Sequence, residues 1–413
     1  MSHPGLLDGP IYLDYNATTP VDPQVVDVAV LYLREHFGNP SSAHDYALAP
    51  RQAIEHARLQ VGQLLGAGPE EIVFTSGGSE SDALAIRGAA LANRDRGNHV
   101  ITQNTEHPAV LETCRALEND DFRVTYLTVD NYGRVDPADL RRALTDDTVL
   151  VSIMFANAET GTLQPIDELA ALAHEQGALF HTDAAQAVGK VPLDVDEFRI
   201  DLLTVVGHKM YAPKGVGALY MRTGTKLEPL IRGGGQERAV RAGTENVALI
   251  AALGAAAEIA HHELPHSAHR LSAVRDRLHD RLTELLPGRV TLNGHPTNRL
   301  PGTLNISITA TLGQELLAKT PGIAAATGSA CHEGEDRPSP VLTAMGLDPE
   351  RAMAALRLTL GRWSTDTEVE RAALLIAGSA QLTFAESEPS LVVPDTADRG
   401  NRQPGTGWSR GST

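Results

Sequence analysis

Between residues 70 and 221, short runs of β-branched and other apolar residues alternate with amphipathic stretches. This alternation is typical of a mainly parallel sheet whose strands are connected by covering helices. The sequence therefore predicts an α/β fold with a seven-stranded, mainly parallel sheet. We expect its strands near residues 72–75, 99–102, 123–129, 148–155, 178–183, 201–206 and 215–221.

Two other segments repeat apolar residues at helical spacing and then stop at a glycine. They are residues 54–65, which precede Gly66, and residues 166–173, which precede Gly177. We expect both segments to form helices that face the core.

A second structural region is expected after the sheet. The Ala-rich segment 247–262 precedes Pro265, which we expect to break the helix, and mixed strand and helix patterns follow. Residues 386–413 are rich in Pro, Gly, Ser, Asp and Arg and lack apolar periodicity, which predicts a disordered tail. We expect a large domain over residues 16–263 and a smaller α+β domain over residues 264–385.

The composition limits the partners that the chain can bind. Its formal net charge of -17 disfavours binding to phosphate backbones, so we expect no direct contact with nucleic acid. Its two cysteines are too few for a disulfide framework and lack the CxxC spacing of a zinc site. We therefore expect no structural metal.

The first ten residues, MSHPGLLDGP, lack the basic stretch and apolar run of a signal peptide. We also expect no later apolar segment to reach membrane-spanning length. The expected location is the cytoplasm, without a membrane partner.

Two predicted strands end in residues that carry chemistry. The strand in "ALFHTD" stops at Asp183, and the strand in "DLLTVVGHK" stops at His208 and Lys209. Because the carboxyl ends of parallel strands line one crevice, the carboxylate and the amine can face the same site. A carboxylate keeps a pyridinium nitrogen protonated, and a lysine forms a Schiff base with an aldehyde. A surface salt bridge explains the same spacing, so spacing alone leaves both interpretations open.

The segment "VFTSGGSESDALAI" runs from a strand through Gly77 and Gly78 into a helix that begins near Ser79. Free backbone amides and the positive end of the helix dipole make this a place for a phosphate. The spacing fits neither of the common nucleotide-binding glycine motifs, and a glycine-rich helix start is often only a cap. Together with Asp183 and Lys209 it favours a phosphorylated aldehyde cofactor.

The two cysteines are expected in different surroundings. Cys331, in "TGSACHEGEDRPSP", lies in a polar stretch with no apolar periodicity, so we expect an exposed loop and a reactive thiol. Cys114, in "AVLETCRALE", lies on an amphipathic helix and is interpreted as a buried small apolar residue.

Two further side chains are candidates with structural alternatives. His107, in "NTEHPAV", follows a strand and precedes a helix, where an imidazole can stack on a flat ring or move protons. Arg357, in "LRLTLGRW", can present its fork to a substrate carboxylate. A structural histidine and a solvated helix arginine remain the alternatives.

Taken together, the motifs resemble the NifS/IscS-like cysteine desulfurases, which belong to the class-V aminotransferases and have the fold-type I architecture of pyridoxal-phosphate enzymes. The resemblance covers nearly all of the chain except the tail. It implies that residues 1–15 join the smaller domain. In overall likeness the chain also resembles one member of this family, the desulfurase that serves DNA phosphorothioation in actinomycetes. The motifs that carry the resemblance are "YLDYNATTPVDP", "FGNPSSAH", "EIVFTSGGSESDALAI", "TEHPAVLETC", "HTDAAQAVGK", "GHKMYAPKGVGALY", "GGGQERAVRAGTENV", "GSAC" and "LRLTLGRWST".

The resemblance implies an activity that converts L-cysteine to L-alanine and passes sulfur to an acceptor protein, for iron-sulfur cluster assembly or DNA phosphorothioation. Lys209 would hold pyridoxal phosphate covalently, and Cys331 would carry the sulfur as a persulfide. The chain would be a homodimer in which Thr244 reaches the other subunit's site. The other implied roles are pairing of Asp183 with the pyridine nitrogen, stacking and proton transfer by His107, phosphate binding by Gly78, Ser79 and His208, contact of Gln186 with the phenolic oxygen, and binding of the substrate carboxylate by Asn39 and Arg357.

Three positions depart from the family pattern. Ala158 stands where an asparagine amide contacts the phenolic oxygen, and Val206 stands where a serine hydroxyl contacts the phosphate. Ser79 replaces the commoner threonine. Because hydrogen bonds to charged groups contribute about 1.5–3 kcal/mol each, we expect weaker cofactor binding. The acidic "HEGEDRP" after Cys331 also predicts an acceptor different from the usual iron-sulfur scaffold.

Two rival functions remain at this stage. One is an aminotransferase or selenocysteine lyase that uses the same cofactor site without needing Cys331, since a fold does not fix a function. The other is a scaffold that has lost catalysis and recruits partners through its acidic surface. The substitutions at Ala158 and Val206 favour the scaffold, whereas intact Lys209 and Asp183 argue against it.

Overall fold

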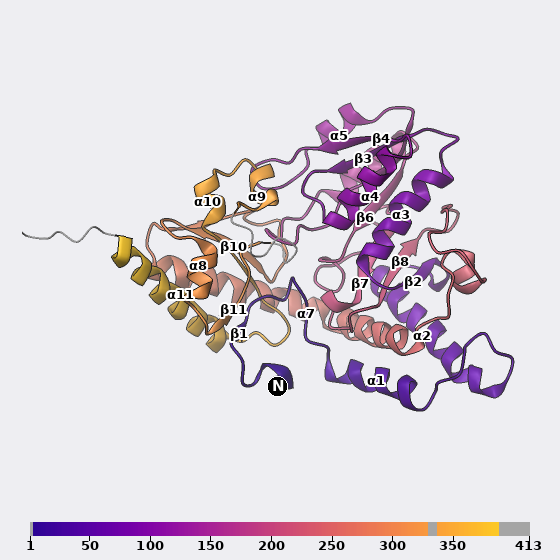
Figure 1. Cartoon of the computed structure of the whole chain (residues 1–413), viewed down its shortest axis with the longest axis horizontal. Coiled ribbons are helices and arrows are strands. Elements are labelled where there is room, and N and C mark those ends of the chain that lie inside the picture. The colour runs from indigo at the N-terminus through magenta and orange to yellow at the C-terminus, as the bar shows by residue number, and fades with distance from the viewer. Residues whose placement is uncertain (1–2, 329–336, 388–413) are drawn as a thin grey trace, which may run out of the picture.

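The computed structural model describes residues 3–328 and 337–387. The predictions for Cys331 and for most of the tail, expected over residues 386–413, therefore fall outside the described residues. Residues 386–387 end the helix α11 (Asp366–Ser387) instead of belonging to the tail. The described part forms one large seven-stranded sheet with its helices and a second, smaller group of strands and helices (Figure 1).

The large sheet confirms all seven predicted strands. Their order across the sheet is β2-β8-β7-β6-β5-β3-β4. The strands are β2 (Ile72–Thr75), β3 (His99–Gln103), β4 (Arg123–Leu127), β5 (Thr148–Ser152), β6 (Leu179–Asp183), β7 (Leu202–Val206) and β8 (Gly217–Met221).

Strands β7, β6, β5, β3 and β4 run parallel, whereas β8 is antiparallel to both of its neighbours. The chain returns from Val206 to Gly217 through a short connection, and a parallel pair would need a crossover of a dozen or more residues. The α/β fold with a mainly parallel sheet is thus confirmed.

Helices cover both faces of the large sheet. On one face, α3 and α4 pack in a cluster that includes the buried Cys114, whose pKa is raised to about 12 by burial. This confirms Cys114 as a small apolar core residue. On the other face, α2, α6 and the first half of α7 fill the largest core cluster. The helices of this part are α1 (Pro23–Arg34), α2 (Leu48–Leu65), α3 (Gly78–Ala92), α4 (Pro108–Glu118), α5 (Pro137–Ala143), α6 (Ile166–Glu175) and α7 (Val247–Leu285).

Two small sheets build the second part of the molecule. One has three antiparallel strands in the order β12-β10-β9, and the other pairs β1 with β11 in parallel, which brings the N-terminal segment to this part of the fold. The strands are β1 (Ile11–Tyr12), β9 (Val290–Leu292), β10 (Thr303–Ile308), β11 (Ile323–Ala324) and β12 (Ala355–Thr359). The helices are α8 (Gly313–Ala318), α9 (Pro340–Ala344), α10 (Pro349–Met353) and α11 (Asp366–Ser387).

Helix α7 runs between the two parts, and here two sequence expectations were wrong. It continues through Pro265 instead of breaking there (Figure 1). The residues around Pro265 are exposed, so water can reach the carbonyl that loses its partner, and both halves of the helix pack into cores. The helix is also long and apolar enough to cross a membrane, although half of its most apolar window is buried inside the protein. It packs against α1, α2 and α11, as a core helix does.

Candidate functional site

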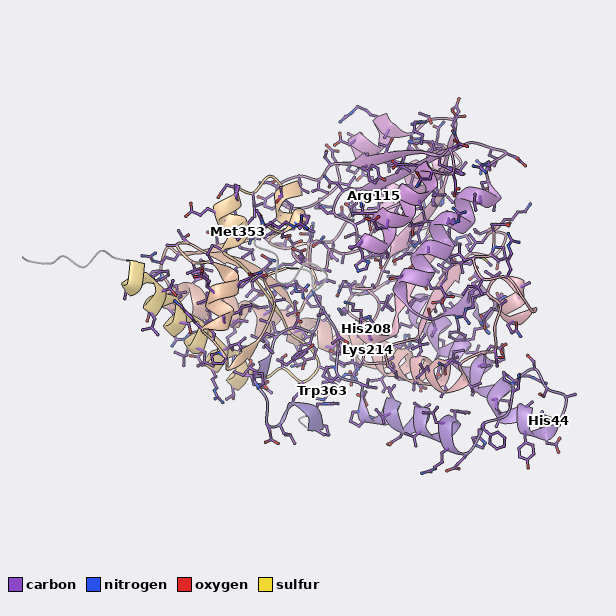
Figure 2. All side chains as sticks on the ribbon, viewed as in Figure 1. His44, Arg115, His208, Lys214, Met353 and Trp363 are labelled. Carbon is purple, nitrogen blue, oxygen red and sulfur yellow. The ribbon has the colours of Figure 1, made fainter. Side chains whose placement is uncertain are left out.

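A cavity of about 540 Å³ opens at the carboxyl ends of the parallel strands. Side chains from loops after β2, β3, β5, β6 and β7 line it, and β12 and α9 close it from the smaller part of the fold. Figure 2 shows His208, one of the lining residues, near the middle of the molecule where the two parts meet. Eight predicted site residues line this cavity, namely Gly78, Ser79, His107, Asp183, Gln186, His208, Lys209 and Arg357.

Asp183 and Lys209 reach the cavity from neighbouring strands, as the spacing predicted. Asp183 ends β6, and Lys209 ends a short 3-10 turn, η4 (Gly207–Lys209), directly after β7. Strands β6 and β7 are parallel neighbours, with Asp183 opposite Thr204. The Lys209 Nζ donates to the carbonyl oxygens of Asn16 at 2.5 Å and Ala17 at 2.9 Å. The amine is thus held beside the cavity by backbone oxygens.

Three buried carboxyl groups share the floor of this cavity. Burial raises the pKa of Asp183 above its usual value, and the Ala185 amide, His107 and Lys209 offset only part of this rise. Burial, followed by the charge of Asp183, raises the pKa of Asp82 well above its usual range. Burial also raises the pKa of Glu106. Because Asp183 has cationic neighbours, it is the carboxyl of the three that we expect to ionise.

The start of α3 supplies backbone amides to the same cavity. Gly77 caps the helix without a side-chain hydrogen bond and has a φ of 149°, which favours glycine. A Cβ on Gly78 would lie 2.7 Å from Val206 Cγ2, so the loop passes directly over the end of β7. The substituted Val206 therefore contributes methyl groups to the wall beside the helix start.

The two cavity histidines have different hydrogen-bond partners. Burial, with the nearby cations Lys209, Lys214 and Lys190, lowers the pKa of His208 to about 4, so this ring is neutral at pH 7. Its Nδ1 lies 3.2 Å from Thr18 Oγ1. His107 caps α4, and its Nδ1 accepts from the Ala109 amide at 3.1 Å. The proton of a neutral His107 ring therefore sits on Nε2.

Arg357 brings a buried cation to the cavity from β12 of the smaller part. Its side chain is almost fully buried, and Nη2 donates to Asp14 Oδ1 at 2.7 Å. Across residues 3–328 and 337–387, its Nε is among the buried polar atoms that have no hydrogen-bond partner. Such an atom suits an anionic group of a ligand in the cavity.

Two predicted site residues do not line the cavity of the single chain. Asn39 is exposed, and its Oδ1 accepts from the Ser41 amide at 2.9 Å. Thr244 is also exposed, in the loop before α7. Their roles stay predictions.

Sequence reasoning missed several residues of the cavity wall. Asn16 is 4% exposed and reaches the site from the turn after β1, far from the other motifs in sequence. Asp82 follows the predicted phosphate loop, and Glu106 precedes His107, so their positions next to recognised residues were the available signal. Within the described ranges, Asp82 Oδ1 and Glu106 Oε2 also have no hydrogen-bond partner.

The family model described as aminotransferase class-V matches residues 11–372. The chain belongs to the aminotransferase class-V family. Members of this family and the cysteine desulfurases depend on pyridoxal phosphate, which is the cofactor of this chain. The cavity fits that group, because it combines an amine, a buried carboxyl, a helix start built from glycines and unpartnered buried polar atoms.

Individual relatives agree with the family assignment. The chain is 50% identical to "Cysteine desulfurase IscS" of Methanosarcina thermophila over 363 residues, which cover 87% of this chain and 89% of the relative. A solved structure of SspA in complex with cysteine matches with a TM-score of 0.76 at 37% identity, covering 86% of this chain and 99% of SspA. DndA from Streptomyces lividans matches with a TM-score of 0.72 at 36% identity, covering 83% and 97%.

Proposed function

We propose that this class-V family member is a cysteine desulfurase. It would convert L-cysteine and the thiol of Cys331 into L-alanine and a persulfide on Cys331. The observation that supports this most directly is the meeting of Lys209, Asp183 and Arg357 in one cavity. An amine, a buried carboxyl and a carboxylate-binding cation are the groups that chemistry on a free amino acid requires.

Pyridoxal phosphate, when bound, supplies an electron sink for the bonding pair that is left when the substrate Cα loses its proton. Lys209 would hold it covalently, and Asp183 would hold its pyridine nitrogen. Gly78, Ser79 and His208 would bind the phosphate. The scaffold alternative finds no support here, since the amine and the carboxyl both face the cavity.

Lys209 is placed to move the Cα proton. Its Nζ lies against the carbonyl oxygens of Asn16 and Ala17, which orient the amine. The Lys209 amine would remove the proton from Cα and return it elsewhere on the substrate skeleton. His107, with its proton on Nε2, would transfer protons to or from the substrate and the thiols.

Arg357 would bind the substrate carboxylate. Its Nη2 is held by Asp14, and its Nε is a buried donor without a partner in the described part of the chain. A guanidinium binds a carboxylate more specifically than an ammonium does, because its donors form a planar fork. Asn39 is proposed to contact the same carboxylate.

We assign the role of nucleophile in the sulfur transfer step to Cys331. Its thiolate would attack the sulfur of the substrate, so the substrate C–S bond breaks, a new S–S bond forms and the carbon skeleton leaves as alanine after taking up a proton. Residues on both sides of the segment that contains Cys331 contact the site. Gly328 packs near Glu159, and Ser339 Oγ donates to Glu159 Oε2 at 2.6 Å.

A homodimer is proposed as the working form. Thr244 is exposed and does not line the cavity of its own chain, which suits a residue that serves the other subunit. The loop before it is built on left-handed residues, Glu237 to Ala239, and is fixed by the buried Arg58–Glu237 ion pair. This anchoring favours a loop that is already ordered before the second subunit binds over a flexible one.

The persulfide would pass to an acceptor protein in the cytoplasm. Two destinations remain proposals, iron-sulfur cluster assembly and DNA phosphorothioation. The likeness to both IscS and DndA supports a sulfur donor without choosing between these destinations.

Two variants test the proposed function. Lys209→Ala should abolish the visible absorption of the bound cofactor and the release of alanine. Cys331→Ser should keep the absorption and lose desulfuration. Mass spectrometry of the Cys331 peptide after incubation with L-cysteine should show one added sulfur in the wild type. Desulfuration that persists in Cys331→Ser would overturn the sulfur-carrier role. Loss of desulfuration in this variant would exclude an aminotransferase that does not need this thiol.

A further inference from the structure

Lys190 lies directly behind the cofactor cavity, at the end of the "AQAVGK" turn. Its Nζ donates to Gln186 Oε1 at 2.7 Å and to Asn16 Oδ1 at 3.4 Å. It does not line the cofactor cavity and instead borders a second cavity of about 370 Å³ on the other side of Asn16. Lys190 therefore touches the cofactor site through Gln186 and Asn16.

Gln186 is held at both ends of its amide. The side chain is 5% exposed, and its Nε2 donates to the Asn16 carbonyl at 2.9 Å while its Oε1 accepts from Lys190. An ammonium group has three donors and no acceptor, so it can pair only with the oxygen end of an amide. Lys190 thus selects one of the two amide orientations, the one that keeps the nitrogen on the side of Asn16.

The orientation matters because the cofactor's phenolic oxygen carries negative charge when it ionises, and it then needs donors. An amide nitrogen has two hydrogens, of which one pairs with the Asn16 carbonyl. The other position expected to contact the phenolic oxygen is Ala158, which has no side-chain donor. Its backbone carbonyl accepts a hydrogen bond from Asn16 Nδ2. The donor at this corner of the cavity therefore depends on Gln186.

We propose that Lys190 is a positioning residue that fixes Gln186 as a donor to the phenolic oxygen of pyridoxal phosphate. The inference rests on the proposed function, since it assumes that this cofactor occupies the cavity. A cation behind the amide also polarises it, which strengthens the hydrogen bond to an anionic acceptor.

The surroundings of Lys190 agree with this role. Burial, with the charges of Lys209 and Arg357 on the cavity side, lowers its pKa to about 7, so the ammonium form that pairs with the amide oxygen predominates below that pH. Two carboxamide oxygens, from Gln186 and Asn16, face its ammonium in place of a carboxylate. Within the described part of the chain, its contacts therefore serve two side chains of the cofactor wall and include no ion pair.

The test measures binding of two ligands to the apoprotein by equilibrium titration. One is pyridoxal phosphate, and the other is its 3-deoxy analogue, which lacks the phenolic oxygen. Lys190→Met should weaken binding of pyridoxal phosphate about tenfold, as expected for one charge-assisted hydrogen bond, and leave binding of the analogue unchanged. Lys190→Arg should restore most of the loss, because it keeps a cationic donor. Lys226→Met, which removes an exposed lysine, is the matched control.

A double-mutant cycle with Gln186→Ala separates positioning from a general structural effect. Once Gln186 is gone, Lys190→Met should cause no further loss of affinity. Equal losses for both ligands, or additive losses in the cycle, would overturn the proposal. If Lys190→Met fails to fold, judged by thermal unfolding of the apoprotein, Lys190→Gln takes its place, because it retains a donor. This variant should lose affinity for pyridoxal phosphate, by less than tenfold, and keep its affinity for the analogue. A wild-type apoprotein that does not bind pyridoxal phosphate would instead refute the proposed function.

Discussion

Arg357 Nη2 donates to Asp14 Oδ1 at 2.7 Å, joining β12 to the segment that follows β1. The contact fixes one arm of the guanidinium, whose side chain also lines the cavity. We therefore expect the carboxylate of Asp14 to orient the fork that is proposed to bind the substrate carboxylate.

The first prediction concerns this pair. Asp14→Asn should raise KM for L-cysteine about tenfold with a smaller change in kcat, because it loses a charge-assisted hydrogen bond that orients the fork. Arg357→Lys should raise KM more, by about 100-fold, since a point charge replaces the fork. Steady-state kinetics of alanine release measures both. A loss of kcat at unchanged KM would contradict the assigned role.

The second prediction concerns the methyl groups of Val206 beside Gly78. Val206→Ser should tighten pyridoxal phosphate binding by about tenfold or more, since one added hydrogen bond to a charged group contributes about 1.5–3 kcal/mol. Val206→Ala is the control, because it removes the methyl groups without adding a hydroxyl. Titration of the apoproteins measures the effect, and equal affinities for the Ser and Ala variants would show that the hydroxyl does not reach the phosphate.

The third prediction concerns the buried ion pair between Arg58 and Glu237. The two side chains form two parallel hydrogen bonds of 2.8 and 2.9 Å, and Glu237 also accepts from the Phe74 amide. Arg58→Met leaves a buried carboxylate without its cation, so the free energy of unfolding should fall by about 3–5 kcal/mol. Denaturant titration measures this. Restoration of stability in the double variant Arg58→Met with Glu237→Gln would show that the cost comes from the uncompensated charge.

The fourth prediction concerns acid sensitivity at His99. This buried ring bridges the hydroxyls of Thr148 and Thr125, and burial, with the charge of Arg123, lowers its pKa to about 4. Between pH 6.5 and 4 the unfolded chain binds a proton at this histidine that the folded chain does not bind, so the stability contributed by the neutral ring falls as the pH falls. The expected loss is about 1.4 kcal/mol per pH unit in that window.

His99→Gln provides the measurement for this effect. Subtracting its unfolding free energy from that of the wild type at each pH removes the contribution of the buried carboxyls, which the two proteins share. The difference should shrink by about 1.4 kcal/mol per pH unit below pH 6.5. A difference that stays constant with pH would contradict the lowered pKa.

Much of the fold was readable from the sequence because its signals are local. Each strand of the large sheet appears as a short apolar run, and Gly66 ends α2 in the left-handed conformation that a glycine stop predicts. The antiparallel strand β8 was not distinguished, because its apolar run resembles that of a parallel strand. Pro265 was misjudged for a similar reason, since its local cost is outweighed by packing of both halves of α7 in separate cores.

The sequence by itself determined where in the fold the proposed cofactor-binding groups stand. Asp183 and Lys209 stand at strand ends, and the glycines of the phosphate loop stand at a helix start, so their positions follow from element boundaries. Only the tertiary structure decided the neighbours of these groups. Asn16 meets Lys209 across more than 190 residues of chain, and Asp82 and Glu106 share the cavity floor with Asp183. Such contacts set orientation and pKa, and they arise from packing between distant segments, which no local pattern records.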